Sequence, residues 1–108
     1  MQFIDKAPLY RIIRITGPTH NLLGLELSEN PTSAKPTIDI LDAGDDAPAK
    51  LNLDDVLAAV SKGVDAVSGE TGKTFWIKRI QFLQSDSRPV EIYTMLAAEI
   101  LRRVAAGP

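Results

Sequence analysis

The chain has 108 residues, of which 44% are apolar and 24% are charged. This length and balance predict a single globular domain over residues 1–108, with a partly flexible segment at 1–8, and exclude collagen-like and wholly disordered chains. There is no cysteine and His20 is the single histidine, which excludes disulfides, thiolate catalysis and cysteine-based or multi-histidine metal sites.

Charge and hydropathy also limit the partners of the chain. Twelve basic against fourteen acidic side chains leave a formal net charge of −2, so nucleic acid is an unlikely partner on electrostatic grounds. No segment approaches the ~18 consecutive apolar residues that cross a bilayer. The first residues also lack the apolar run of a signal peptide, so we expect a cytoplasmic protein without membrane attachment.

Three strands are expected in the first half of the chain, at Leu9–Thr16, Leu22–Ser28 and Thr37–Leu41. They are rich in β-branched or leucine residues, and segments with glycine or proline separate them. In the second strand Leu23, Leu25 and Leu27 alternate with small or polar residues, which predicts one buried and one wet face. The short segment at 17–21 favours an antiparallel hairpin between the first two strands.

A helix is expected over Leu53–Val67, where apolar residues recur with helical spacing. Asn52 is a suitable N-cap for this helix. Gly63 weakens the helix unless it permits a close contact, and Gly69 and Gly72 mark the exit.

The last two expected elements are a strand over Lys73–Leu83 and a helix over Pro89–Ala105. Pro89 suits the first turn of that helix, with Ser87 or Arg88 as its cap. Glu99 is placed to pair with Arg103 one turn later.

The element order β-β-β-α-β-α predicts an α+β domain with two layers: a four-stranded mixed sheet and two helices packed on one of its faces. The third strand, first helix and fourth strand are long enough for a crossover between parallel strands. Glu26 and Asp39 are then expected on the face that the helices leave uncovered.

Strict alternation in the strand at 73–83 separates its large apolar residues. Trp76, Ile80 and Phe82 fall on one face, and Phe75 and Ile77 on the other. Because two helices on one side of a sheet cannot cover both sets, we expect the first set to form an interface with another chain. A two-fold homodimer is the commonest closed oligomer that buries such a surface, so it is the expected assembly.

The segment at 85–89 (SDSRP) is the best candidate for a ligand site. It lies between a strand and a helix, where unbonded backbone N–H groups and the helix dipole favour an anion. Ser85, Ser87 and Arg88 would supply further hydrogen-bond donors. The structural alternative is a serine cap beside a surface arginine.

Residues 68–74 (SGETGKT) end in a Gly-Lys-Thr run that resembles the phosphate-binding loop of the P-loop nucleotide hydrolases. That loop has the spacing GxxxxGK[ST], whereas Val67 stands at its first position here. A P-loop also follows a strand and precedes a helix, the reverse of the order expected at this point. The run therefore predicts a helix C-cap and a glycine-rich turn.

Three further patterns have simple structural alternatives. Six aspartates between residues 39 and 55 could offer oxygen ligands to calcium or magnesium, but no EF-hand spacing is present. His20, Ser85 and Asp86 contain the parts of a hydrolytic triad, which only geometry defines. Phe75 and Trp76, which have basic residues beside them, could stack on nucleic-acid bases, but the negative net charge of the chain opposes this interpretation. Solvated loops and core packing account for all three.

No catalytic constellation emerges from these patterns. The expected function is therefore a small non-catalytic protein-interaction module, that is, an accessory, regulatory or inhibitory protein without a cofactor or metal. The expected partner is a second copy or another protein. The alternative is a small-molecule or anion-binding protein, or a small enzyme, that uses residues 85–89.

Overall fold

The computed structural model describes residues 2–16, 19–28, 30–31, 35–41, 51–83 and 90–107, with the backbone alone at 16, 19 and 20. The elements in chain order are β1 (Gln2–Lys6), β2 (Leu9–Thr16), β3 (Thr19–Ser28), β4 (Thr37–Leu41), α1 (Leu53–Thr71), β5 (Trp76–Leu83) and α2 (Ile92–Ala106). The protein is therefore α+β, as expected, with a sheet of five strands rather than four.

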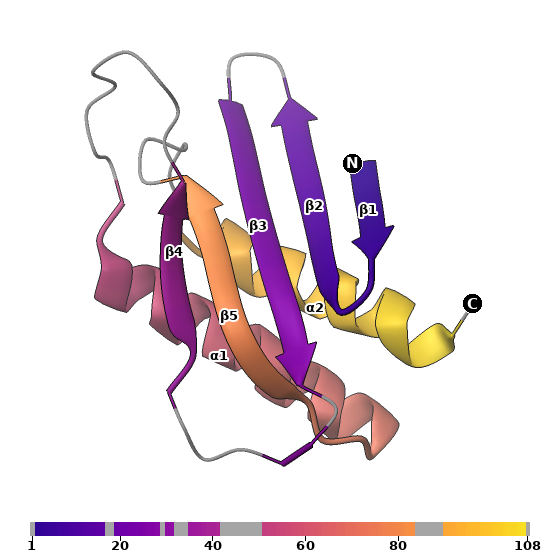
Figure 1. Cartoon of the computed structure of the whole chain (residues 1–108). Coiled ribbons are helices and arrows are strands. Elements are labelled where there is room, and N and C mark those ends of the chain that lie inside the picture. The colour runs from indigo at the N-terminus through magenta and orange to yellow at the C-terminus, as the bar shows by residue number, and fades with distance from the viewer. Residues whose placement is uncertain are drawn as a thin grey trace.

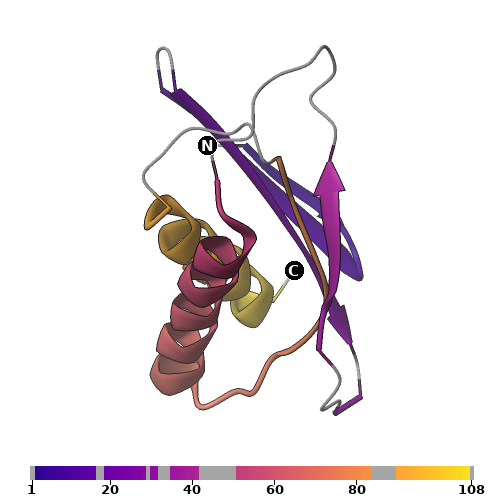
Figure 2. The ribbon, with the colours of Figure 1, turned by 90° about the vertical axis from the view of Figure 1, so that its left-hand side faces the viewer.

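The sheet and the two helices form two layers (Figure 1). Figure 2 shows the sheet edge-on, with α1 and α2 side by side on the same face. The opposite face, which no described helix covers, is called the open face below.

The strand order in the sheet is β1-β2-β3-β5-β4. All neighbours are antiparallel except β4 and β5, which are parallel and are linked through α1 as the sequence predicts. The pairing of β2 with β3 continues to Thr16 and Thr19, so the connection between them is shorter than the expected loop at 17–21.

β1 is the additional strand, in the segment that the sequence predicts to be partly flexible. It pairs antiparallel with β2 over all five of its residues. Phe3 anchors it: its ring stacks on Tyr10 with 6.2 Å between the ring centroids, and the guanidinium carbon of Arg103 in α2 lies 5.1 Å from the Phe3 centroid. Because Arg103 lies in the last helix, no local sequence pattern predicts this contact.

A β-bulge in β5 changes which of its side chains share a face. Glu26 of β3 pairs with Arg79, but the next residue, Leu27, pairs with Ile77. Lys78 is therefore an extra residue without a partner across the ladder, and the alternation of faces is reversed on its two sides. Ile77 and Ile80, which strict alternation would place on opposite faces, therefore lie on the same face of the sheet.

α1 begins at Leu53 as predicted, but it continues through Gly69 and ends at Thr71 rather than at Val67. The Oδ1 atom of Asn52 accepts hydrogen bonds from the backbone N–H groups of Asp54 at 2.9 Å and Asp55 at 3.3 Å. Gly72 ends the helix in the left-handed conformation, with φ of 70°. The C-cap predicted at the Gly-Lys-Thr run is thereby confirmed.

α2 begins at Ile92 rather than at Pro89. Its N-cap is Glu91 and makes no side-chain capping hydrogen bond, so the prediction of Ser87 or Arg88 at this position is wrong. The predicted ion pair between Glu99 and Arg103 is present, with 2.9 Å between Oε1 and Nε.

The two helices approach each other closely at Gly63. A Cβ atom at this position would lie 2.5 Å from the carbonyl oxygen of Thr94 and 2.9 Å from the Cβ of Ala97. The Thr94 hydroxyl also donates to the carbonyl oxygen of Ala59 at 2.7 Å, which ties the two helices together. Gly63 thus permits the close contact that would justify a glycine inside a helix.

The core fills the space between the helices and the sheet. Its largest fully buried side chains are Ile12, Leu23, Leu25, Val56, Val60, Val67, Phe82, Tyr93, Leu96, Ile100 and Leu101. Leu57 of α1 and Ile77 of β5 are partly buried and pack against these residues.

Candidate interaction surface and ligand pocket

The predicted interface residues of β5 do not lie on one surface. Ile80 and Phe82 are 3% and 0% exposed and belong to the core beneath the helices, so they are not available to another chain. Trp76 pairs with Ser28 and, because of the bulge, lies on the open face, half-buried. The expectation that the helices leave one apolar set of β5 uncovered is wrong. Ile80 and Phe82 lie in the core, and Phe75 and Ile77 pack against the same core.

The predicted anion-binding residues Ser85, Ser87 and Arg88 lie outside the described residues. The structure shows the two elements that they connect, β5 and α2, and it shows β5 parallel to β4. The segment therefore follows the carboxyl end of a parallel pair, the edge at which α/β sheets bind ligands.

A polar network crosses the open face over four strands. The Nε of Arg11 in β2 donates to Oε1 of Gln81 in β5 at 3.1 Å, and Nε2 of Gln81 donates to Oδ2 of Asp39 in β4 at 3.0 Å. Although no described helix covers this face, Gln81 is only 6% exposed. Both ends of its amide are hydrogen-bonded, which offsets the cost of burying it.

Gly24 of β3 lies beneath this network. A Cβ atom there would lie 2.9 Å from Oε1 of Gln81 and 3.3 Å from Cγ of Arg11. The absence of a side chain allows Arg11 to reach across β3 to Gln81. Alternation within β3 predicts a small residue at Gly24, but no sequence pattern points to Arg11 or Gln81 as its neighbours.

A second group of charges lies beside the first. Glu26 accepts a hydrogen bond from Nε of Arg79 at 3.1 Å and forms an ion pair with Nζ of Lys78 at 3.4 Å, and Nη1 of Arg79 lies 3.6 Å from Asp39. This confirms the expectation that Glu26 and Asp39 point to the uncovered face. Because Lys78, Arg79 and Asp39 are each at least 36% exposed, each of these pairs contributes at most about 1 kcal/mol to stability.

Apolar side chains occupy the open face at the end of the sheet near Thr19. Ile13 pairs with Leu22, and Leu83 pairs with Leu41, so a row of half-buried apolar residues follows the strands across the sheet. Ile15 continues the open-face side of β2 and is 70% exposed, more than any other large apolar side chain among the described residues. We call Ile13, Ile15, Leu22, Leu41 and Leu83 the apolar row.

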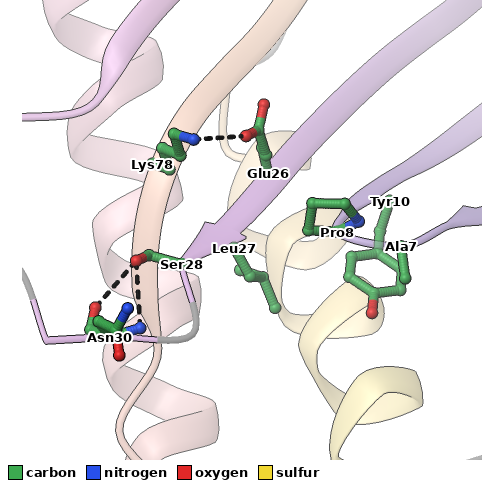
Figure 3. A pocket seen from close by; sticks show the side chains of 8 residues that line it. All are labelled: Ala7, Pro8, Tyr10, Glu26, Leu27, Ser28, Asn30 and Lys78. Atoms are coloured by element: carbon green, nitrogen blue, oxygen red, sulfur yellow. Dashed lines mark hydrogen bonds and ion pairs between the residues drawn. The ribbon is translucent and has the colours of Figure 1, made fainter.

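A pocket opens at the other end of the sheet, near Ser28 (Figure 3). Its volume is about 620 Å³, and it is lined by Ala7, Pro8, Tyr10, Glu26, Leu27, Ser28, Asn30 and Lys78. One wall is the turn between β1 and β2, and the other is the end of β3 together with the bulge of β5. No sequence pattern predicts this pocket, because its walls come from three separate parts of the chain.

Among the described residues, an ion pair whose members have shifted pKa values lies away from both the open face and the pocket. Arg102 of α2 donates two hydrogen bonds to the carboxylate of Glu70 in α1, at 2.7 Å and 3.0 Å. These hydrogen bonds lower the pKa of Glu70 and raise that of Arg102. Both groups are exposed, so we assign the pair to the contact between the helices.

The described ranges, with their gaps, contain no group of three histidine or acidic side chains placed to hold a metal ion. Within the acidic segment, Asp39 is bonded to Gln81, and Asp54 lies in the first turn of α1. No helix in the described part of the chain is long and apolar enough to cross a membrane.

Comparison of the chain with protein-family models, with curated proteins and with solved structures finds no match.

Proposed function

We propose that the protein is a small non-catalytic interaction module and that a second copy of the chain covers the end of its open face at the apolar row. The observation that carries the proposal is the exposure of Ile15, at 70%, on the sheet face that no described helix covers. Burying apolar area of this kind is the main driving force for association between proteins. The proposal includes a cytoplasmic location, which follows from the sequence expectation.

The charges on the open face favour a second copy of the chain over a partner that carries charge of only one sign. Arg11 and Arg79 lie on the same face as Glu26 and Asp39, within one connected network. A two-fold axis brings the same patch of two subunits together, so a patch that carries both signs can match itself. A strongly acidic or basic partner would instead leave half of these groups facing like charge.

We expect Ile15→Glu to weaken self-association by at least about tenfold, because it places a carboxylate within a contact between apolar side chains. Met95→Glu is the matched control: Met95 is also exposed, at 39%, but lies on α2 in the helical layer. Size-exclusion chromatography with light scattering would compare both variants with the unmodified chain. Equal dimer fractions for the two variants would contradict the assignment of the apolar row.

A second candidate function is anion binding by residues 85–89, supported by the parallel pairing of β4 with β5. We expect inorganic phosphate to shift the amide resonances of residues 85–90, and Arg88→Ala to abolish these shifts by removing a donor. Arg103→Ala is the control, because Arg103 lies near the end of α2 and pairs with Glu99. Shifts that persist in Arg88→Ala, or their absence from this segment, would exclude the site.

A further inference from the structure

We propose that a cavity between β1 and the last turn of α2 binds a small aliphatic amino acid, with its ammonium group at Asp5 and its carboxylate at Arg103. The cavity has a volume of about 240 Å³ and is lined by Phe3, Asp5, Tyr10, Arg103, Val104 and Gly107. This volume is below the roughly 300–1,000 Å³ of sites for drug-sized ligands, so the cavity suits a ligand of few atoms.

The side chains that line this cavity lie on one side of the sheet. Phe3 pairs with Ile12, which is fully buried beneath the helices, and Asp5 pairs with Tyr10 on the same face. The other lining residues belong to α2 or directly follow it. The larger pocket near Ser28 differs, because its charged and apolar walls lie on opposite faces of the sheet. Since the apolar row lies on the open face, binding in this cavity does not depend on dimer formation.

Arg103 is held in position by two contacts that leave part of its guanidinium group unused. Its Nε donates to Oε1 of Glu99 at 2.9 Å, and its guanidinium carbon lies 5.1 Å from the centroid of the Phe3 ring. The Phe3 ring in turn stacks on Tyr10. Because the bond to Glu99 uses Nε, the two terminal nitrogens can form a bidentate contact with an incoming carboxylate. A guanidinium that is already positioned also loses less conformational entropy when the ligand binds.

Asp5 supplies the opposite charge to the same cavity. Its Oδ1 accepts a hydrogen bond from the backbone N–H of Ala7 at 3.2 Å, and no described residue forms an ion pair with it. The carboxylate can therefore accept further hydrogen bonds from an ammonium group. A ligand of a single charge would face a like charge at either Asp5 or Arg103, whereas an amino acid carries both signs.

The apolar walls determine which kind of amino acid fits. Phe3 and Val104 are partly buried and pack against the core, so contact with an aliphatic side chain removes more of their surface from water. A charged side chain would lose water in this cavity without gaining a partner, because the ammonium and carboxylate groups of the ligand already engage Asp5 and Arg103. The site therefore favours an aliphatic amino acid.

Titration of the whole chain with leucine at neutral pH, followed by amide NMR, tests the site against two matched probes. The first, 3-methylbutan-1-amine, is leucine without its carboxylate, and the second, 4-methylpentanoate, is leucine without its ammonium group. We expect leucine to bind with a Kd of about 1 mM, as its small number of atoms allows. Each of the other probes should bind at least about tenfold more weakly, because it lacks one charge-assisted contact. The shifts should centre on Phe3, Asp5, Tyr10 and Arg103.

Two substitutions separate the charged contacts. Asp5→Asn should weaken leucine binding at least about tenfold without weakening that of 4-methylpentanoate, since asparagine keeps the acceptor for Ala7 and loses only the charge. Arg103→Gln should likewise weaken the binding of leucine but not that of the amine. The matched controls are Asp65→Asn in α1 and Arg102→Gln in α2, because both residues are exposed and lie outside the cavity.

Amide spectra of each variant without probe would establish that the fold is retained. Equal affinity of the unmodified chain for the three probes, shifts centred elsewhere, or no shifts up to about 20 mM would overturn the proposal. It would also be overturned if Asp5→Asn or Arg103→Gln weakened all three probes equally, because such a loss would reflect a general change of the cavity rather than the loss of one charged contact.

Discussion

Replacement of Gly63 by alanine is expected to lower the free energy of unfolding by about 1–3 kcal/mol, the range typical of overpacked sites. In an exposed helix the same change stabilises by about 1 kcal/mol. At Gly63 the new methyl group would lie 2.5 Å from the Thr94 carbonyl oxygen and 3.1 Å from the backbone nitrogen of Ala98. Backbone atoms cannot turn aside as a flexible side chain can, so α1 and α2 would have to separate.

Gly69→Ala is the matched control for this prediction. Gly69 lies in the same helix, and a Cβ atom there would meet nothing within 4 Å. We expect this variant to gain about 0.5–1 kcal/mol, from helix propensity and the smaller entropy of the unfolded chain. Urea unfolding followed by circular dichroism would measure both. Stabilisation by both substitutions would show that the helices do not meet at Gly63.

Leu96→Ala is expected to have the largest effect of a single substitution, a loss of about 2–5 kcal/mol. Leu96 of α2 is fully buried in the core between the helices and the sheet. A domain with a total stability of about 5–15 kcal/mol would lose much of its folded population at elevated temperature.

The neighbouring Met95 provides the comparison, because it is 39% exposed on the same helix. Met95→Ala should change stability by no more than about 0.5 kcal/mol, as surface substitutions generally do. Differential scanning calorimetry would separate the two, since about 1 kcal/mol shifts the Tm by several degrees in a domain of this size. Similar melting temperatures for both variants would contradict the helix register.

Local sequence signals predict most of the elements correctly. The bounds of β2 and β4 agree with the structure, because β-branched residues fill them and turn-forming residues flank them. The ends of α1 follow from Asn52 and Gly72, because the preference of asparagine for the N-cap and of glycine for the C-cap depends only on the local backbone conformation. The parallel pairing of β4 and β5 follows from the helix between them.

The features that could not be predicted depend on contacts between distant residues. β1 contains Phe3 and Ile4 in succession, without alternation, and is ordered by Tyr10 and Arg103. The bulge at Lys78 is visible only when β5 is aligned with β3, so strict alternation places Trp76 on the same face as Ile80 and Phe82, whereas the structure places it on the opposite face. No periodicity reveals a bulge, since the residues around it are ordinary strand residues.

The polar network of the open face could not be predicted for the same reason. Arg11, Gln81 and Asp39 come together only after β2, β5 and β4 have taken their places in the sheet. Glu26 and Asp39 could be assigned to this face because alternation within a strand suffices for that. Their partners depend on strand order, which the sequence does not determine.

Sedimentation equilibrium at tens of micromolar tests the central claim, that two copies meet through the apolar row. The proposal predicts a mass that rises with concentration toward twice 11.7 kDa, the mass of one chain. Ile15→Glu should shift this rise to higher concentration, whereas Met95→Glu should leave it in place. A mass of 11.7 kDa at every concentration would contradict the claim.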